Sequence, residues 1–205
     1  MARKDTSAAA VGTVEHANTA VLVTVAPDGA LLDRRRIALT EGLPTHPHHH
    51  EGSWAVGRYL DSPWARPVTL PEALELVECV RAAAAEGARQ GLADLSAAVP
   101  VPIARIALRV CPALPPTAEA RIADTRAQTV ADSVMYREAL AAAAAALGWE
   151  VTWYDRDRVF DEAQAALGDT ALAPFLTAMG RAAGPPWRAE HKLAAAAAIA
   201  ALHGK

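Results

Sequence analysis

The chain has 205 residues, enough for one domain with a buried core, and 52% of them are hydrophobic. The net charge of −3 at pH 7 provides no overall positive field, so charge does not favour nucleic acid as a partner. No apolar run is long enough to cross a membrane, and the N-terminus lacks the apolar core of a signal peptide. We therefore expect a cytoplasmic protein. Its heavy use of Ala, Arg, Gly and Pro is typical of a bacterium with GC-rich DNA.

The first elements in chain order predict a β-hairpin. Residues 1–14 are small and polar, and we expect a flexible N-terminus followed by a single α/β domain over residues 15–205. Two β-type runs, residues 19–25 and 30–39, flank the turn sequence Ala26-Pro27-Asp28-Gly29. The first run is apolar on both faces and is expected inside the sheet, whereas the charged second run suits an edge.

The remaining elements predict helices that alternate with strands. Thr69 and Glu72 form a capping-box pattern at the start of an apolar-periodic helix over residues 69–98. A strand over 103–110, a helix over 128–147 and a strand over 149–154 follow, and this order is typical of a crossover between parallel neighbours. Three further helices are predicted over residues 158–167, 169–183 and 187–202.

This element order is similar to that of the ribonuclease H-like fold and resembles its Holliday-junction-resolvase branch. The Ala-rich run from Trp187 to Leu202 looks like the last helix of that branch, where an acidic residue near the helix start completes a metal site. Glu190 takes that place, with His191 beside it. The resemblance implies a three-layer α/β domain with an N-terminal hairpin and a C-terminal helix, a hydrolase or nuclease relative, and a divalent metal ion.

Two positions depart from the pattern of that branch. Many members of the fold carry an aspartate in the first strand, and residues 19–25 contain none. The branch also places a carboxylate near the end of the strand at Ile103, where this chain has Arg109, Val110 and Cys111. Because two cations need several carboxylates, these departures predict a degenerate or altered metal site.

A dense histidine cluster lies in the long segment after the hairpin. Neutral imidazole is a good ligand for transition metals, and a loop can present several. The cluster therefore predicts either a metal site or a polar loop whose imidazoles bind backbone groups. The candidate metal ligands are His46, His48, His49, His50 and Glu51.

A second polar group surrounds the helix over residues 128–147. Open α/β sheets usually bind ligands beyond the carboxyl ends of their strands, and the start of this helix is expected there. The alternative is a helix cap with a surface ion-pair network. Asp132 is the candidate catalytic residue of this group, and the candidate binding residues are Asp124, Arg126, Gln128, Ser133, Tyr136 and Arg137.

Three hypotheses for function follow from these patterns. The first is a divergent ribonuclease H-like hydrolase or nuclease relative with an altered metal site, in which Asp132, Glu190 and His191 act together. It predicts that Asp132 and Glu190 both approach the first strand. The second is a transition-metal protein built on His46 to Glu51. The third is a non-catalytic interaction module that forms a homodimer through the tryptophan-bearing loop.

Overall fold

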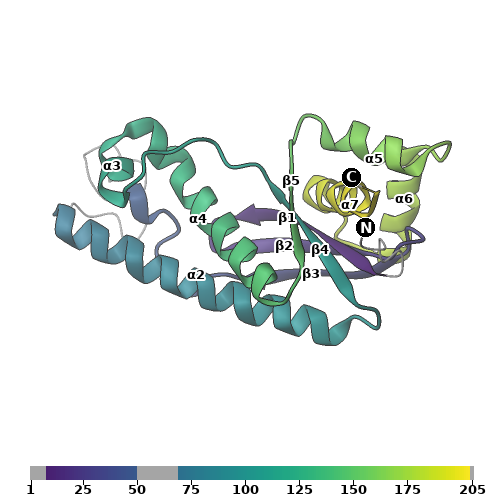
Figure 1. Ribbon diagram of the computed structural model, residues 1–205, viewed down its shortest axis with the longest axis horizontal. Coiled ribbons are helices and arrows are strands. Elements are labelled where there is room, and N and C mark those ends of the chain that lie inside the picture. Colours follow the sequence, from purple (N-terminus) through teal and green to yellow (C-terminus); the bar gives the residue numbers. More distant parts are fainter. Residues whose placement is uncertain (1–7, 50–68, 204–205) are drawn as a thin grey trace, which may run out of the picture.

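The computed structural model describes residues 8–49 and 69–203 of the chain. Within these residues, five strands form one mixed sheet in the order β3-β2-β1-β4-β5 (Figure 1). The strands are β1 (Ala9–His16), β2 (Thr19–Val25), β3 (Leu31–Ala38), β4 (Ile103–Arg109) and β5 (Glu150–Tyr154). The first three pair antiparallel, whereas β1, β4 and β5 run parallel. The predicted hairpin, the internal position of β2, the edge position of β3 and the parallel pairing are confirmed.

Strand β1 corrects the expectation that residues 1–14 form a flexible segment. Ala9–His16 is the central strand of the sheet, paired with β2 on one side and with β4 on the other. The side chains of Ala9, Ala10 and Val11 are fully buried. A run of small residues is a weak hydrophobic signal on its own, but it suits a strand that has a layer packed on each face. The domain therefore begins well before residue 15.

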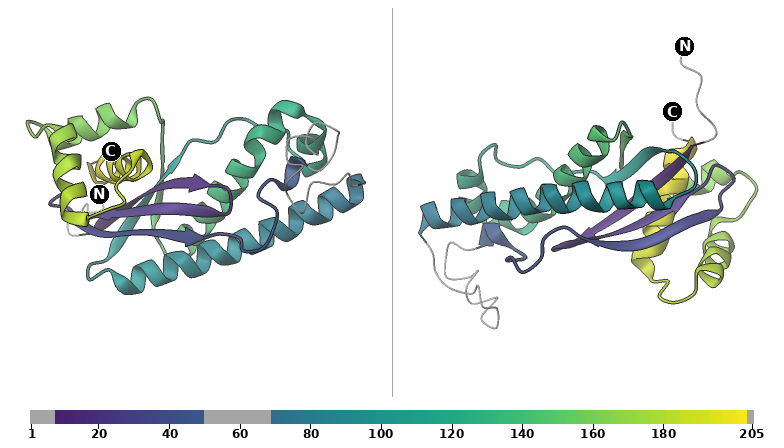
Figure 2. Two further views of the ribbon diagram at one scale, coloured as in Figure 1. Left: turned by 180° about the vertical axis from the view of Figure 1, so that it is seen from behind. Right: turned by 90° about the horizontal axis from the view of Figure 1, so that it is seen from below.

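Large apolar side chains fill the layer between the sheet and helices α2 (Leu70–Ala98) and α4 (Thr125–Ala146). Leu92 and Leu95 of α2 and Leu140 of α4 belong to one core cluster with Leu22 and Ile106 of the sheet. Figure 2 shows that the N-terminal half of α2 extends beyond the sheet. There it packs against α3 (Ala118–Ala123) and contacts the short helix η1 (Pro47–His49).

Three helices cover the other face of the sheet: α5 (Val159–Leu167), α6 (Leu172–Ala183) and α7 (Ala189–His203) (Figure 1). Helix α7 lies directly on the sheet, and its residues from Ala194 to Ala198 are buried. A Cβ atom at Gly12 would lie 1.8 Å from the carbonyl oxygen of Ala194. The glycine therefore lets the backbones of α7 and β1 approach closely, which places the start of α7 beside the end of β1.

The predicted helices are present with shifted boundaries. Thr69 and Glu72 form the expected capping box, with 2.8 Å between the Thr69 nitrogen and Glu72 Oε2. Helix α4 begins at Thr125, three residues before the predicted start, and α3 was not expected. In the described part of the chain, no helix is both long and apolar enough to cross a membrane.

Candidate ligand site at the carboxyl edge of the parallel strands

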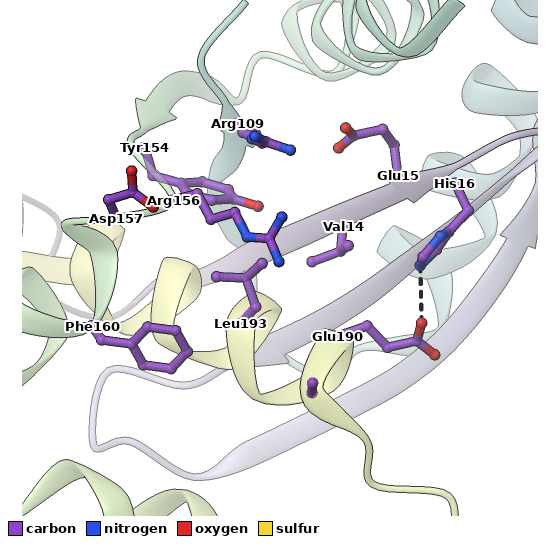
Figure 3. Close-up of a pocket in the computed structure, with 11 residues that line it drawn as sticks. Val14, Glu15, His16, Arg109, Tyr154, Arg156, Asp157, Phe160, Glu190 and Leu193 are labelled. Atoms are coloured by element: carbon purple, nitrogen blue, oxygen red, sulfur yellow. Dashed lines mark hydrogen bonds and ion pairs between the residues drawn. The ribbon is translucent and has the colours of Figure 1, made fainter. Parts of the chain in front are cut away.

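The carboxyl ends of β1, β4 and β5 meet at one edge of the sheet because these three strands run parallel. Their last residues are His16, Arg109 and Tyr154. A cavity of about 470 Å³ lies at this edge, between the strand ends and the starts of α5 and α7 (Figure 3). We call it the carboxyl-edge cleft. Its lining residues are Val14, Glu15, His16, Arg109, Tyr154, Arg156, Asp157, Phe160, Ala189, Glu190 and Leu193.

Glu15 of β1 forms a buried ion pair with Arg137 of α4. The side chains of Glu15 and Arg137 are only 6% and 5% exposed. Arg137 donates from Nε to Glu15 Oε1 over 2.8 Å and from Nη1 to the Val110 carbonyl oxygen over 2.9 Å. Burial by itself would lower the pKa of Arg137, but the hydrogen bond and charge of Glu15 raise it above its ordinary value. The Arg137 guanidinium therefore keeps its charge beside Glu15, and the contact joins α4 to the end of β1.

Glu190, in the first turn of α7, contacts basic side chains of two strands, β1 and β3. Its Oε2 lies 2.9 Å from His16 Nε2, and its Oε1 accepts a hydrogen bond of 2.8 Å from Arg36 (Figure 3). Burial would raise the pKa of Glu190, but the charges of Arg36 and His16 hold it below its ordinary value. Each glutamate that lines the cleft is thus held by a basic side chain from another element.

Asp132 lies in a separate centre, on the face of the sheet that α2 and α4 cover. His48 Nδ1 lies 2.6 Å from Asp132 Oδ1, and His46 Nδ1 lies 3.2 Å from Oδ2. The side chains of His48 and Asp132 are 2% and 6% exposed, whereas that of His46 is 34% exposed. The histidine segment is therefore fastened to α4 through one carboxylate. The side chain of His49, together with His50 and Glu51, lies outside the described residues.

The predicted catalytic group does not assemble. Asp132 lies on α4 and Glu190 on α7, and these helices cover opposite faces of the sheet. Both carboxylates were expected at the first predicted strand, residues 19–25; instead, Glu190 lies at the end of β1 and Asp132 on the other face of the sheet, so they do not form one centre. His191 follows Glu190 on α7, and its Nδ1 lies 3.9 Å from Glu190 Oε1. Its ring stacks on Trp187 with centroids 5.7 Å apart, and its Nδ1 accepts a hydrogen bond from the Arg188 backbone.

The predicted binding residues divide into structural and cavity-lining groups. Asp124 caps α4 by accepting hydrogen bonds from the backbones of Arg126 and Ala127. Gln128 is buried and donates to the Ile122 carbonyl oxygen, and Arg126 is exposed. The Tyr136 hydroxyl donates to Asn18 over 2.9 Å, and burial raises its pKa to about 12. Asp124, Gln128 and Tyr136 thus bind neighbouring parts of the chain and help to hold α4 in place.

Ser133 and Arg137 do line a cavity. It has a volume of about 530 Å³ and lies on the α4 side of the ends of β4 and β5. Arg109 and Arg156 line both this cavity and the carboxyl-edge cleft. Ser133 and Arg137 thus lie above the strand ends, where the polar pocket was expected, and ligand binding by this group stays a prediction.

The sequence-based prediction missed Glu15, Arg109 and Arg156 as cleft residues. Glu15 was overlooked because β1 was not recognised as a strand. Arg109 was noted only for occupying a place where the resolvase branch has a carboxylate. One signal in the sequence would have found both arginines: each stands at the end of a predicted strand or just beyond it, where parallel sheets present side chains to ligands.

A divalent metal does not fit the described residues of the cleft. Mg²⁺ and Mn²⁺ need carboxylate oxygens that are open to the ion. Here Glu15 forms an ion pair with the buried guanidinium of Arg137, and Glu190 forms ion pairs with Arg36 and His16. Among the described residues, no group of three or more His, Cys, Asp and Glu side chains is arranged to hold a metal ion.

The sheet order, the helices on both faces and the final helix on β1 define the ribonuclease H-like class of α/β proteins. The chain is similar in structure to RuvC of Thermus thermophilus solved in complex with Holliday junction substrate. The TM-score is 0.51 at 14% sequence identity, over 95% of this chain and 93% of that chain. A second Thermus thermophilus RuvC structure gives a TM-score of 0.48 at the same identity and coverage.

No family model and no curated protein matches this sequence. The fold predicted from the element order is thus confirmed by the structural similarity, together with the single α/β domain. At 14% identity, the similarity establishes the fold alone.

Proposed function

We propose that this chain is a non-catalytic ribonuclease H-like domain in which basic side chains occupy the place of the metal ions. The observation that carries the proposal is the buried Glu15–Arg137 pair at the end of the central strand. Removing Arg137 from this pair to admit a cation would leave a buried guanidinium without its counter-charge, a cost of about 3–5 kcal/mol. Among the described residues that line the cleft, Asp157 is then the one carboxylate without an ion pair, whereas two-metal phosphodiester cleavage requires several carboxylates.

The second candidate is a transition-metal site on the histidine segment. The observation that favours it is the way Asp132 holds His46 and His48 through their Nδ1 atoms. Carboxylates that bind one nitrogen of an imidazole commonly orient the other nitrogen toward a metal. His46, with a partly exposed side chain, is the described residue through which this candidate can be tested.

One titration experiment separates the two candidates. The untagged full chain is titrated with Mn²⁺ and with Zn²⁺ in a calorimeter, and each titration is repeated with Glu190→Gln and with His46→Ala. We expect no saturable Mn²⁺ binding, and no cleavage of a four-way DNA junction or of single strands with Mg²⁺ or Mn²⁺. Near-stoichiometric Mn²⁺ binding that disappears in Glu190→Gln would overturn the main proposal. Zn²⁺ binding that disappears only in His46→Ala would establish the second candidate.

A further inference from the structure

Two guanidinium groups in the carboxyl-edge cleft have no counter-charge bound to them. Within residues 8–49 and 69–203, neither Arg109 nor Arg156 makes a side-chain hydrogen bond or an ion pair. Both line the cleft and the neighbouring cavity on the α4 side. Figure 3 shows the Arg156 guanidinium between Tyr154 and Val14, and the Arg109 side chain beyond Tyr154, pointing toward Glu15.

The carboxylates of the cleft do not neutralise these two arginines. Glu15 is taken by Arg137, and Glu190 is taken by Arg36 and His16. Among the residues that the structure describes, Asp157 is the one other carboxylate that lines the cleft. The cleft therefore carries a local excess of positive charge although the whole chain has a net charge of −3. Because the two arginines lie at a concave edge with apolar walls, their field is focused on a bound anion.

Apolar side chains also line the cleft, and one of them is an aromatic ring. Val14 and Leu193 lie beside Arg156, and Phe160, at the start of α5, is 41% exposed (Figure 3). An exposed phenylalanine beside cations is a surface on which a flat ring of a ligand can stack. The volume of about 470 Å³ lies in the range of pockets that bind small molecules.

We propose that the carboxyl-edge cleft binds a phosphate monoester that carries a planar ring, with Arg109 and Arg156 on the phosphate and Phe160 on the ring. Guanidinium groups match phosphate oxygens in charge and in bidentate geometry, and two of them suit a dianion. Asp157 is placed to accept hydrogen bonds from ligand hydroxyl groups. The inference rests on the proposed function, because it requires that Glu15 and Glu190 are held by basic side chains and not by metal ions.

The test uses AMP as the probe and the full chain in buffer that contains EDTA. We expect calorimetry to detect AMP binding, weaker binding of inorganic phosphate and no binding of adenosine. Arg109→Gln and Arg156→Gln should each weaken AMP binding by about tenfold to a hundredfold, the usual loss of a charged hydrogen bond. Phe160→Ala should weaken the binding of AMP but not of inorganic phosphate.

Arg158→Gln is the matched control. Arg158 is an exposed arginine two residues after Arg156, lies outside the lining of both cavities and contacts Glu162 at 3.5 Å. Its substitution should leave AMP affinity unchanged. Thermal unfolding of each variant shows whether it is folded, and the exposed or half-buried positions of the arginines make large losses of stability unexpected.

The outcomes separate this inference from the proposed function. No AMP binding with or without Mg²⁺, in a chain that also binds no Mn²⁺, overturns the inference and leaves the proposed function standing. AMP binding that requires Mg²⁺ or Mn²⁺ overturns both. A 5′-phosphorylated tetranucleotide identifies the source of the phosphate: binding at least ten times tighter than AMP points to a strand end, and weaker binding points to a free metabolite.

Discussion

The two faces of the sheet are packed in different ways. On the face of α2 and α4, long side chains such as Leu92, Leu140 and Tyr136 separate the helices from the strands. On the other face, alanines of α7 meet Ala10 and Gly12 of β1, so the helix backbone lies almost on the strand. Small residues allow the backbones of α7 and β1 to approach closely. They leave little tolerance for added side-chain volume, because no flexible side chain lies between the two backbones to adjust. The close face is also the one that brings Glu190 to the end of β1.

Each face carries a polar centre, and the difference in packing separates their roles. Asp132 and His48 are buried on the face covered by α2 and α4, where their contact joins η1 to α4. The carboxyl-edge cleft instead opens where the start of α7 meets the ends of the parallel strands. Its arginines remain accessible to solvent. The first centre is therefore expected to govern stability, and the second to govern binding.

The largest expected effect is that of Gly12→Ala, which tests the close face directly. The new Cβ would meet the Ala194 carbonyl oxygen at 1.8 Å, so α7 must move away from β1. We expect the free energy of unfolding to fall by about 3 kcal/mol or more, at or above the upper end of ordinary overpacking. Urea unfolding followed by circular dichroism measures it, and AMP affinity should fall as Glu190 moves away from His16.

Gly42→Ala is the control for the glycine change itself. Gly42 has a positive φ of 68° but no atom within 4 Å of its Cβ position. Its substitution should lower the free energy of unfolding by about 1–2 kcal/mol, through backbone strain alone. If the two variants lose equal stability, close packing of α7 on β1 is not what Gly12 provides.

A smaller effect is expected for Asp132→Asn on the other face. The change replaces with an amide the carboxyl group that lies 2.6 Å from His48 Nδ1 and 3.2 Å from His46 Nδ1. The loss should be about 1–3 kcal/mol, the range for a buried group deprived of its partner. His46→Ala, at a partly exposed position, should cost less. AMP affinity should be unchanged in both variants, and a loss in Asp132→Asn would show that the two centres are not separate.

Features that depend on residues close together in the sequence could be predicted, whereas features that depend on residues far apart in the sequence could not. Local patterns were sufficient for the hairpin at Pro27 to Gly29, the capping box at Thr69 and the parallel pair of β4 and β5. From these, the ribonuclease H-like order could be predicted. The central strand was missed because small residues such as Ala9 and Ala10 show their burial only when helices from residues 189–203 and 125–146 are in place.

The site was predicted less well than the fold for the same physical reason. The dense motifs, His46 to Glu51 and Asp124 to Arg137, drew attention because their polar residues are adjacent in sequence. Most of the described residues among them serve in caps and core hydrogen bonds. The cleft instead combines residues from β1, β4, α7 and the segment after β5, each isolated in its own stretch. A pairing such as Glu15 with Arg137 is set by tertiary packing, which a local pattern does not encode.

The smallest expected effect is a pH dependence of stability that arises on the face of the sheet covered by α7. Burial lowers the pKa of His191, which stacks on Trp187, although Glu190 partly opposes the shift. The folded chain therefore holds His191 neutral below the ordinary pKa of about 6.5, where the unfolded chain takes up a proton. This contribution to stability is complete above about pH 6.5 and is lost as the pH falls toward the lowered pKa. We expect His191→Gln to reduce the fall in melting temperature between pH 7.5 and 5.5, whereas His203→Gln, at an exposed position on the same helix, should not. An equal fall in the wild type and in His191→Gln would show that His191 is not the residue that couples this face to pH.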